Sequence, residues 1–224
     1  MAEDDWGATA NAAQSSLNNQ LHDAAALGDV AALRAALAAG ADVETRMTGN
    51  GVTRTPLARA VNPRITISEK RRTACVRALL LAGASPSAPI TGRSGGSWMP
   101  LHDAAFLSLY TVCRLLLDAG ADVNVLSNLA VNDSPLTYAA ATQHTRNQRV
   151  IALFLSRGAV DGPSVDPMSR SLYLRKIRAA GSFAVYEKQH RAKLVAMLAP
   201  KLGHLLPPEL VSVVITFWAP VGLH

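Results

Sequence analysis

The chain has 224 residues, of which 49% are hydrophobic and only 5% aromatic, and its formal net charge is +6. It contains no run of about eighteen apolar residues, which argues against a transmembrane helix, and its acidic start argues against a signal peptide. The two cysteines, Cys75 and Cys113, lie on apolar stripes, which disfavours a secreted fold built on disulfides. The composition therefore predicts a cytoplasmic or nuclear protein that packs helices through Ala, Leu and Val.

The first eighteen residues are rich in Ala, Asn, Ser and Gln and show little apolar periodicity. Such a composition offers few side chains for a packed core. We expect residues 1–18 to form a disordered lead-in, with at most a short helix near Leu17.

The region that follows repeats itself. One five-residue segment occurs twice without change, at Leu21–Ala25 and again at Leu101–Ala105. Nineteen residues after its leucine, each copy reaches the tetrapeptide Gly-Ala-Asp-Val, which begins at Gly40 and at Gly120. Two weaker copies are interleaved and run from Thr55 to Gly83 and from Ser134 to Gly158. The chain therefore contains four successive units of similar design.

Each unit is predicted to contain two short helices. Pro56, Pro100 and Pro135 stand at the start of a first helix, where proline is tolerated because its missing N–H group would be unpaired anyway. Apolar residues at helical spacing predict the second helix, and the glycine after it suits the left-handed backbone that ends a helix. The apolar stripes of the four second helices contain Val30, Leu33, Leu37, Cys75, Val76, Leu79, Leu80, Val112, Cys113, Leu115, Leu116, Val150, Ile151, Leu153 and Phe154. Because a unit of this kind has apolar faces on both sides, the units must stack to bury them.

This pattern resembles the ankyrin repeat, which runs from Thr-Pro-Leu-His-x-Ala-Ala through an apolar helix to Gly-Ala-Asp-Val-Asn. The resemblance covers residues 19–161 and implies four ankyrin repeats. The expected fold class is an all-α ankyrin-repeat solenoid, in which helix-turn-helix units are joined by β-hairpin-like fingers. The resemblance also implies that His22 and His102 bridge backbone groups of adjacent hairpins. Ala58 and Thr137 replace this histidine in the other two units.

The units are longer than a regular ankyrin repeat. The glycines that end them are 43, 37 and 38 residues apart, against about 33 in the regular pattern. The second unit has its extra residues between its two helices, where residues 62–68 are expected to form an ordered surface loop. The fourth unit has a smaller insertion near residues 143–147. Residues 94–97, Ser-Gly-Gly-Ser, are expected to form a flexible finger tip.

The resemblance implies a protein-binding module whose partner lies in the concave groove between the fingers and the first helices. Ankyrin geometry places on this groove the residue before Thr-Pro, the residue after Leu-His and the two residues after Ala-Ala. The corresponding residues here are Asp23, Arg54, Arg59, Trp98, Asp103, Phe106, Leu107, Asp133 and Tyr138. Trp98 and Phe106 are expected to be the centre of the surface, because aromatic anchors dominate many interfaces. The alternative for this pair is that Trp98 folds against its own finger and Phe106 lies under the insertion of the second unit.

Beyond residue 161 the repeat pattern fades. Residues 162–204 are expected to form a degenerate capping repeat, with helices near 171–180 and 185–198, because the last unit of a solenoid needs a polar outer face. Residues 55–224 carry a net charge of +10, and much of the excess lies after residue 145. A solvated cap explains this charge more simply than binding to nucleic acid or to an acidic partner, since no stacking aromatic residues accompany it.

The last segment, residues 205–224, is predicted to form an apolar helix. Its opening, Leu-Pro-Pro-Glu-Leu at residues 206–210, resembles the start of an F-box, a helical module that joins substrate receptors to cullin ubiquitin ligases. The segment 205–218 is therefore expected either to cover the last repeat or to dock onto a ubiquitin-ligase component, which would make the protein a substrate-recognition adaptor.

Nothing in the sequence favours catalysis. It has no nucleophile elbow, phosphate loop or dinucleotide motif, and His144, His190, His204 and His224 show no spacing that suits a zinc site. We expect a non-enzymatic protein, monomeric, with no cofactor, metal or membrane association.

Overall fold

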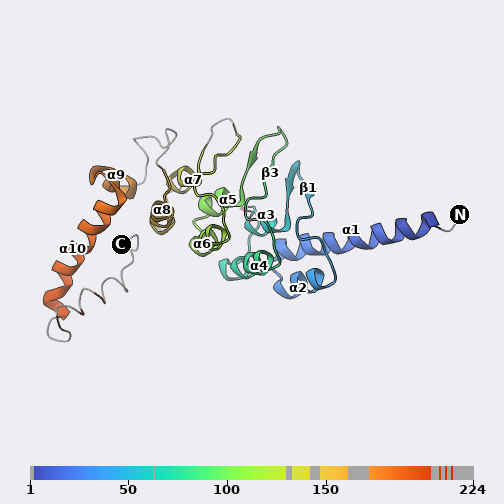
Figure 1. Ribbon diagram of the computed structural model, residues 1–224, viewed down its shortest axis with the longest axis horizontal. Coiled ribbons are helices and arrows are strands. Elements are labelled where there is room, and N and C mark those ends of the chain that lie inside the picture. The colour runs from blue at the N-terminus through green and yellow to red at the C-terminus, as the bar shows by residue number, and fades with distance from the viewer. Residues whose placement is uncertain are drawn as a thin grey trace. The chain divides into compact units, whose positions relative to one another are not determined.

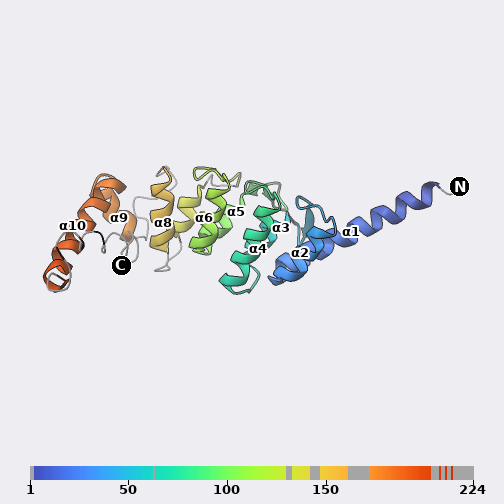
Figure 2. The same ribbon diagram turned by 60° about the horizontal axis from the view of Figure 1, so that its bottom comes forward.

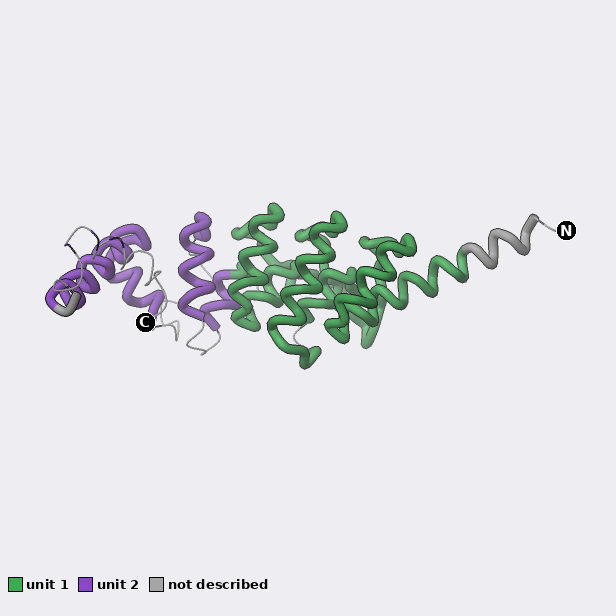
Figure 3. Tube along the Cα trace, turned by 90° about the horizontal axis from the view of Figure 1, so that it is seen from below, with its two compact units in different colours: residues 1–135 green, residues 136–224 purple. Residues whose placement is uncertain are grey.

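The computed structural model describes residues 3–62, 64–129, 133–141, 147–160 and 172–202, together with Pro207, Leu210 and Val213. Helices account for 61% of the chain, which agrees with the mostly helical class predicted from the sequence. Two compact units divide the chain, residues 1–135 and residues 136–224 (Figure 3).

The first unit contains three helix pairs and four short strands. Its elements in chain order are α1 (Glu3–Leu27), α2 (Val30–Ala38), β1 (Met47–Gly49), β2 (Val52–Arg54), α3 (Pro56–Val61), α4 (Glu69–Leu81), β3 (Ile90–Thr91), β4 (Ser97–Trp98), α5 (Pro100–Phe106) and α6 (Tyr110–Asp118). Helix α3 packs against both α1 and α5, while α4 packs against both α2 and α6. The first helices of the pairs thus form one layer and the second helices another (Figure 1). Figure 2 shows the second helices α2, α4 and α6 following one another in a row.

The fingers between the helix pairs join into one antiparallel sheet of order β1-β2-β3-β4. Met47 pairs with Arg54, Thr53 with Thr91, and Ile90 with Trp98. The next finger adds a single bridge between Ser97 and Asn128. The sheet lies beside the layer of first helices, on the side away from the second helices (Figure 1).

The helices begin and end where the local sequence predicts. Pro56 and Pro100 occupy the first position of α3 and α5. The Asp29 carboxylate caps α2 by accepting hydrogen bonds from the backbone N–H groups of Ala31 and Ala32, both at 3.0 Å. Gly40 follows α2 with a φ of 92°, a backbone conformation that glycine adopts without the steric cost that a Cβ atom would add.

The core of the first unit lies between the helix layers and confirms most of the apolar stripes. Leu33, Cys75, Val112 and Leu116 are all completely buried. Both cysteines are free and buried, as predicted. Leu115 is only partly buried, because it lies at the edge of the α6 stripe.

Helix α1 corrects the prediction for the N-terminus. Residues 3–18 belong to this helix, where the sequence analysis expects a disordered lead-in. Two observations explain the difference: the segment holds several alanines and no proline, which favours a helix, and polar side chains tie it to the first finger. The Gln14 amide donates to the carbonyl of Gly40 at 3.0 Å, and the Asn18 side chain accepts from the backbone N–H of Asp42 at 2.9 Å.

The insertion between α3 and α4 is held by a buried arginine that the sequence analysis did not single out. Arg72 lies in α4 and is only 4% exposed. Its guanidinium donates to the carbonyls of Ala60 at 2.6 Å, Asn62 at 3.2 Å and Ile65 at 2.8 Å. The expectation of an ordered loop is thus confirmed for its described residues, and Arg72 ties this loop to α4.

The second unit contains two further helix pairs: α7 (Pro135–Ala141) with α8 (Asn147–Ser156), and α9 (Leu172–Ala179) with α10 (Phe183–Leu202). In α8 the predicted apolar residues Val150, Ile151, Leu153 and Phe154 are buried. The last pair lies close to its predicted position. Leu194 of α10 is buried, and the ring of Tyr186 packs edge-on against Tyr173 of α9, with centroids 5.5 Å apart.

The C-terminal helix predicted for residues 205–224 lies outside the described residues apart from Pro207, Leu210 and Val213, and so does most of the insertion near residues 143–147. Its two predicted roles therefore stay predictions. Among the helices that are described, none is both long and apolar enough to cross a membrane.

Candidate protein-interaction surface

The fingers β1–β4 and the first helices α1, α3 and α5 together form the surface on which the sequence places the partner, and we call it the finger face. Three structural features determine which side chains this surface can present to a partner. These are the histidine bridge that supports it, a buried cluster beneath it, and the side chains that it leaves exposed.

The histidine bridge is formed at His102, as the resemblance implies. The His102 ring accepts at Nδ1 from the backbone N–H of Met99, at 3.1 Å, and its Nε2 lies 3.1 Å from the carbonyl of Asp133. Because Nδ1 accepts, the proton must be on Nε2, which donates to that carbonyl. Burial lowers the pKa of His102. The ring is therefore a neutral connector between the start of α5 and the next finger.

His22 makes only half of this bridge. Its Nε2 lies 3.2 Å from the carbonyl of Thr45, whereas its buried Nδ1 has no partner within the described part of the chain. The physical reason is the length of α1: three residues before His22 the backbone N–H already bonds within the helix. Burial also lowers the pKa of His22.

Arg54, Trp98 and Asp103 form a cluster beneath the finger face. The indole N–H of Trp98 donates to Oδ1 of Asp103 at 2.9 Å, and the Arg54 guanidinium carbon lies 5.8 Å from the centre of the indole ring. Arg54 is 6% exposed and Asp103 is 7% exposed. These two residues, predicted to face the partner, therefore lie below the surface, and Trp98 is partly covered by its own repeat. Strand pairing across β3 brings residues from two distant fingers together here.

The Asp103 carboxylate is incompletely satisfied. Its Oδ2 is buried and has no partner in the described residues. Burial raises the pKa of Asp103 to about 6, although the Trp98 hydrogen bond and the positive charges of Arg54 and Arg72 act in the opposite direction. At neutral pH α5 thus carries a buried negative charge on Asp103, and the indole N–H group of Trp98 stabilises this charge.

Replacing Trp98 with phenylalanine should therefore destabilise the protein by about 1–3 kcal/mol at pH 7.5, because the buried carboxylate loses its N–H donor. A carboxyl group whose pKa is raised by folding costs no stability below its unfolded pKa; the cost grows as the pH rises from the unfolded to the folded pKa and is constant above it. Because the variant lacks the N–H donor that lowers the pKa of Asp103, its folded pKa lies above the wild-type value of about 6, and its cost continues to grow at pH values where that of the wild type has levelled off. The loss should consequently shrink towards pH 5. Urea unfolding of both proteins at the two pH values measures it, and the effects of His22 and His102 cancel in the difference. An equal loss at both pH values would contradict this role for Asp103.

Phe106 and Leu107 lie at the end of α5, one of the helices of the finger face. All residues of α5 from Pro100 to Ala105 are buried, yet Phe106 is 47% exposed and Leu107 is partly exposed. This exposure argues against the alternative that Phe106 lies under the insertion between α3 and α4.

The remaining predicted contact residues are distributed along the chain. Asp23 is exposed on α1, and Arg59 of α3 is partly exposed, with its guanidinium against Gly49 of β1. Asp133 is partly exposed, and burial raises its pKa. Tyr138 is partly exposed on α7, in the second unit. The first unit thus contains every predicted contact residue except Tyr138.

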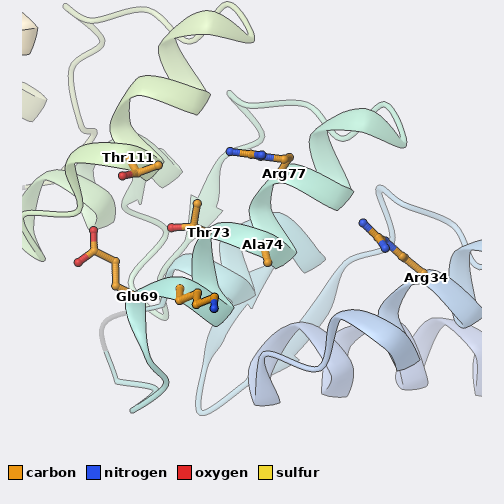
Figure 4. Close-up of a pocket in the computed structure, with 7 residues that line it drawn as sticks. Arg34, Glu69, Thr73, Ala74, Arg77 and Thr111 are labelled. Atoms are coloured by element: carbon orange, nitrogen blue, oxygen red, sulfur yellow. The ribbon is translucent and has the colours of Figure 1, made fainter.

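The layer of second helices in the first unit carries another surface feature, which the sequence did not predict. A cavity of about 600 Å³ opens along the second helices and is lined by Arg34, Glu69, Lys70, Thr73, Ala74, Arg77 and Thr111 (Figure 4). The spacing of the α4 residues, at intervals of three and four, could have indicated a shared helix face. Among the described residues, no group of three His, Cys, Asp or Glu side chains is placed so that it could hold a metal ion.

A comparison with protein families finds a match to part of the first unit. Residues 98–128, which include α5 and α6, match the family model described as Ankyrin repeat. The chain therefore contains an ankyrin repeat at residues 98–128, and ankyrin repeats serve generally as protein–protein interaction modules. No curated protein matches the chain in sequence.

Proposed function

We propose that the protein is a non-enzymatic module that binds a partner protein through the finger face, the surface that corresponds to the ankyrin groove. The observation that carries this proposal is the exposure of Phe106 at the end of an otherwise buried helix. An exposed aromatic residue with a neighbouring leucine can insert into a pocket of a partner and contribute much of the binding energy.

Within this proposal the predicted contact residues divide into two groups. Asp23, Arg59, Phe106, Leu107 and Asp133 would contact the partner directly, as would Tyr138 of the second unit. Arg54 and Asp103 would instead hold Trp98 in place, and Trp98 would contribute its remaining exposed edge. The division follows the burial of each side chain.

We also propose that the four helix pairs from α1 to α8 are the ankyrin repeats of residues 19–161 and that α9 and α10 form the cap. The two pairs of the second unit support this assignment through their glycines: Gly158 ends α8 with a φ of 83°, as Gly40 ends α2, and Gly181 separates α9 from α10 with a φ of 88°, as Gly28 separates α1 from α2. Continuous stacking predicts a single cooperative unfolding transition. Two separated transitions in calorimetry of the full chain would contradict it.

Phe106→Ala should weaken partner binding by about tenfold, the loss expected for a central aromatic anchor. The test is quantitative affinity capture from an extract of the source cells with the wild type, Phe106→Ala and a matched control. Leu172→Ala provides the control, because Leu172 is an exposed apolar residue on α9 of the second unit and is not among the predicted contact residues.

Proteins captured by the wild type and by Leu172→Ala should be depleted with Phe106→Ala, and the Kd of a captured partner should be measured by calorimetry. Circular dichroism and Tm of all three proteins should agree closely. If Phe106→Ala captures the same proteins at the same level, the proposal that Phe106 is the centre of the surface fails.

A further inference from the structure

The second helices of the first unit carry an arginine at the same place in three successive repeats. Arg34, Arg77 and Arg114 each stand six residues before the glycine that ends their repeat. All three side chains are exposed, on α2, α4 and α6 respectively. Because α4 packs between α2 and α6, the arginines follow one another along one face, and we call them the arginine ladder. The fourth repeat has Ala152 at this position, so the ladder has three members.

The cavity of about 600 Å³ lies along this ladder. Figure 4 shows Arg34 extending from α2 towards α4, while Arg77 extends from α4 towards the side of Thr111 on α6. Arg114 follows Thr111 by three residues and therefore lies on the same side of α6. The hydroxyl groups of Thr73 and Thr111 add hydrogen-bonding capacity, and Ala74 leaves space between the charged side chains.

The charge of the cavity is unbalanced. Arg34, Lys70 and Arg77 line it with only one carboxylate, that of Glu69, which lies at the opposite end of the view from Arg34. None of the three cations forms an ion pair or a hydrogen bond with any residue that the structure describes. Uncompensated cations around one cavity repel one another and favour an anionic ligand.

We propose that the arginine ladder binds an extended acidic segment of a partner protein, with a carboxylate at about every third residue. The distance between successive arginines supports this spacing of the acidic residues. Packed helices lie about 8–10 Å apart. A segment in the extended polyproline II conformation advances about 3.1 Å per residue and turns once every three residues, which puts every third side chain on the same face. Acidic side chains three residues apart would therefore meet successive arginines.

A protein segment fits the cavity better than a nucleic acid does. Single-stranded nucleic acids bind through aromatic residues on which their bases stack, and no aromatic side chain lines this cavity. The Glu69 carboxylate would also repel a continuous row of phosphates, whereas it can accept hydrogen bonds from peptide N–H groups.

The experiment measures fluorescence anisotropy of a nine-residue labelled peptide with glutamate at its first, fourth and seventh positions, and serine and glycine elsewhere, so that in the polyproline II conformation the acids follow the arginine spacing on one face. A second peptide of the same composition has its three glutamates adjacent, and a single-stranded oligonucleotide serves as a further polyanion. The test variant combines Arg34→Gln, Arg77→Gln and Arg114→Gln. A matched control combines Arg93→Gln, Arg175→Gln and Lys188→Gln, three exposed cations on the finger tip, α9 and α10.

The spaced peptide should bind the wild type, and the ladder variant should raise its Kd by roughly tenfold, as expected for the loss of several exposed ion pairs. The control variant should leave the Kd within about twofold. Equal weakening by both variants, equal binding of both peptides, tighter binding of the oligonucleotide, or no binding at all would each overturn the proposal. Phe106→Ala should leave peptide binding unchanged, so failure here and failure of the finger-face proposal can be told apart.

Discussion

Replacing Leu116 with alanine should lower the free energy of unfolding by about 2–5 kcal/mol, the range found when a buried leucine is truncated. Leu116 is completely buried in α6, in the third of the three helix pairs of the first unit. The alanine variant loses apolar burial and leaves a cavity between the helix layers, because the surrounding side chains are closely packed and cannot collapse fully. Urea denaturation followed by far-ultraviolet circular dichroism measures the loss.

Leu115→Ala is the natural control for this prediction. Leu115 is the adjacent residue of the same helix but is only partly buried, so the same substitution should cost clearly less. Similar small losses at both positions would contradict the assignment of Leu116 to a stacked core.

Arg72→Met should be the second most damaging of the substitutions considered. The methionine retains much of the apolar stem but removes the donor for three backbone carbonyls, two of them in the insertion between α3 and α4. Removing the cation also relieves the cost of burying its charge, so the net loss should be roughly 2–4 kcal/mol, less than the sum of three charged hydrogen bonds.

Arg71→Met tests whether this loss depends on the bonds or merely on the charge. Arg71 is exposed on the same helix, and its substitution should change stability by no more than about 0.5 kcal/mol. Hydrogen exchange gives a second measurement: the backbone amides of residues 64–67 should exchange faster in Arg72→Met than in Arg71→Met. If the two variants are equally stable, Arg72 does not hold the insertion.

The sequence predicted those features that depend on neighbouring residues. Proline at the start of α3 and α5 and glycine after the second helices mark helix ends because these residues act through their own backbone angles. The apolar stripe that buries Cys75 and Cys113 follows from helical periodicity alone. The bridge formed by His102 could be predicted from the sequence because this histidine is part of the repeat pattern.

Only the tertiary structure decided which polar residues are buried. Arg54, Trp98 and Asp103 meet because β3 pairs with strands from two fingers more than 30 residues apart in the sequence, and no local pattern encodes that pairing. The sequence gives no sign that Arg72 differs from the exposed cations of its helix, yet Arg72 is buried and donates to a carbonyl group of the insertion. Helix α1 extends through residues expected to be disordered, since its side chains bond to a finger some 25 residues further along the chain. Burial and charge compensation depend on contacts between distant segments, and such contacts are determined only when the repeats stack.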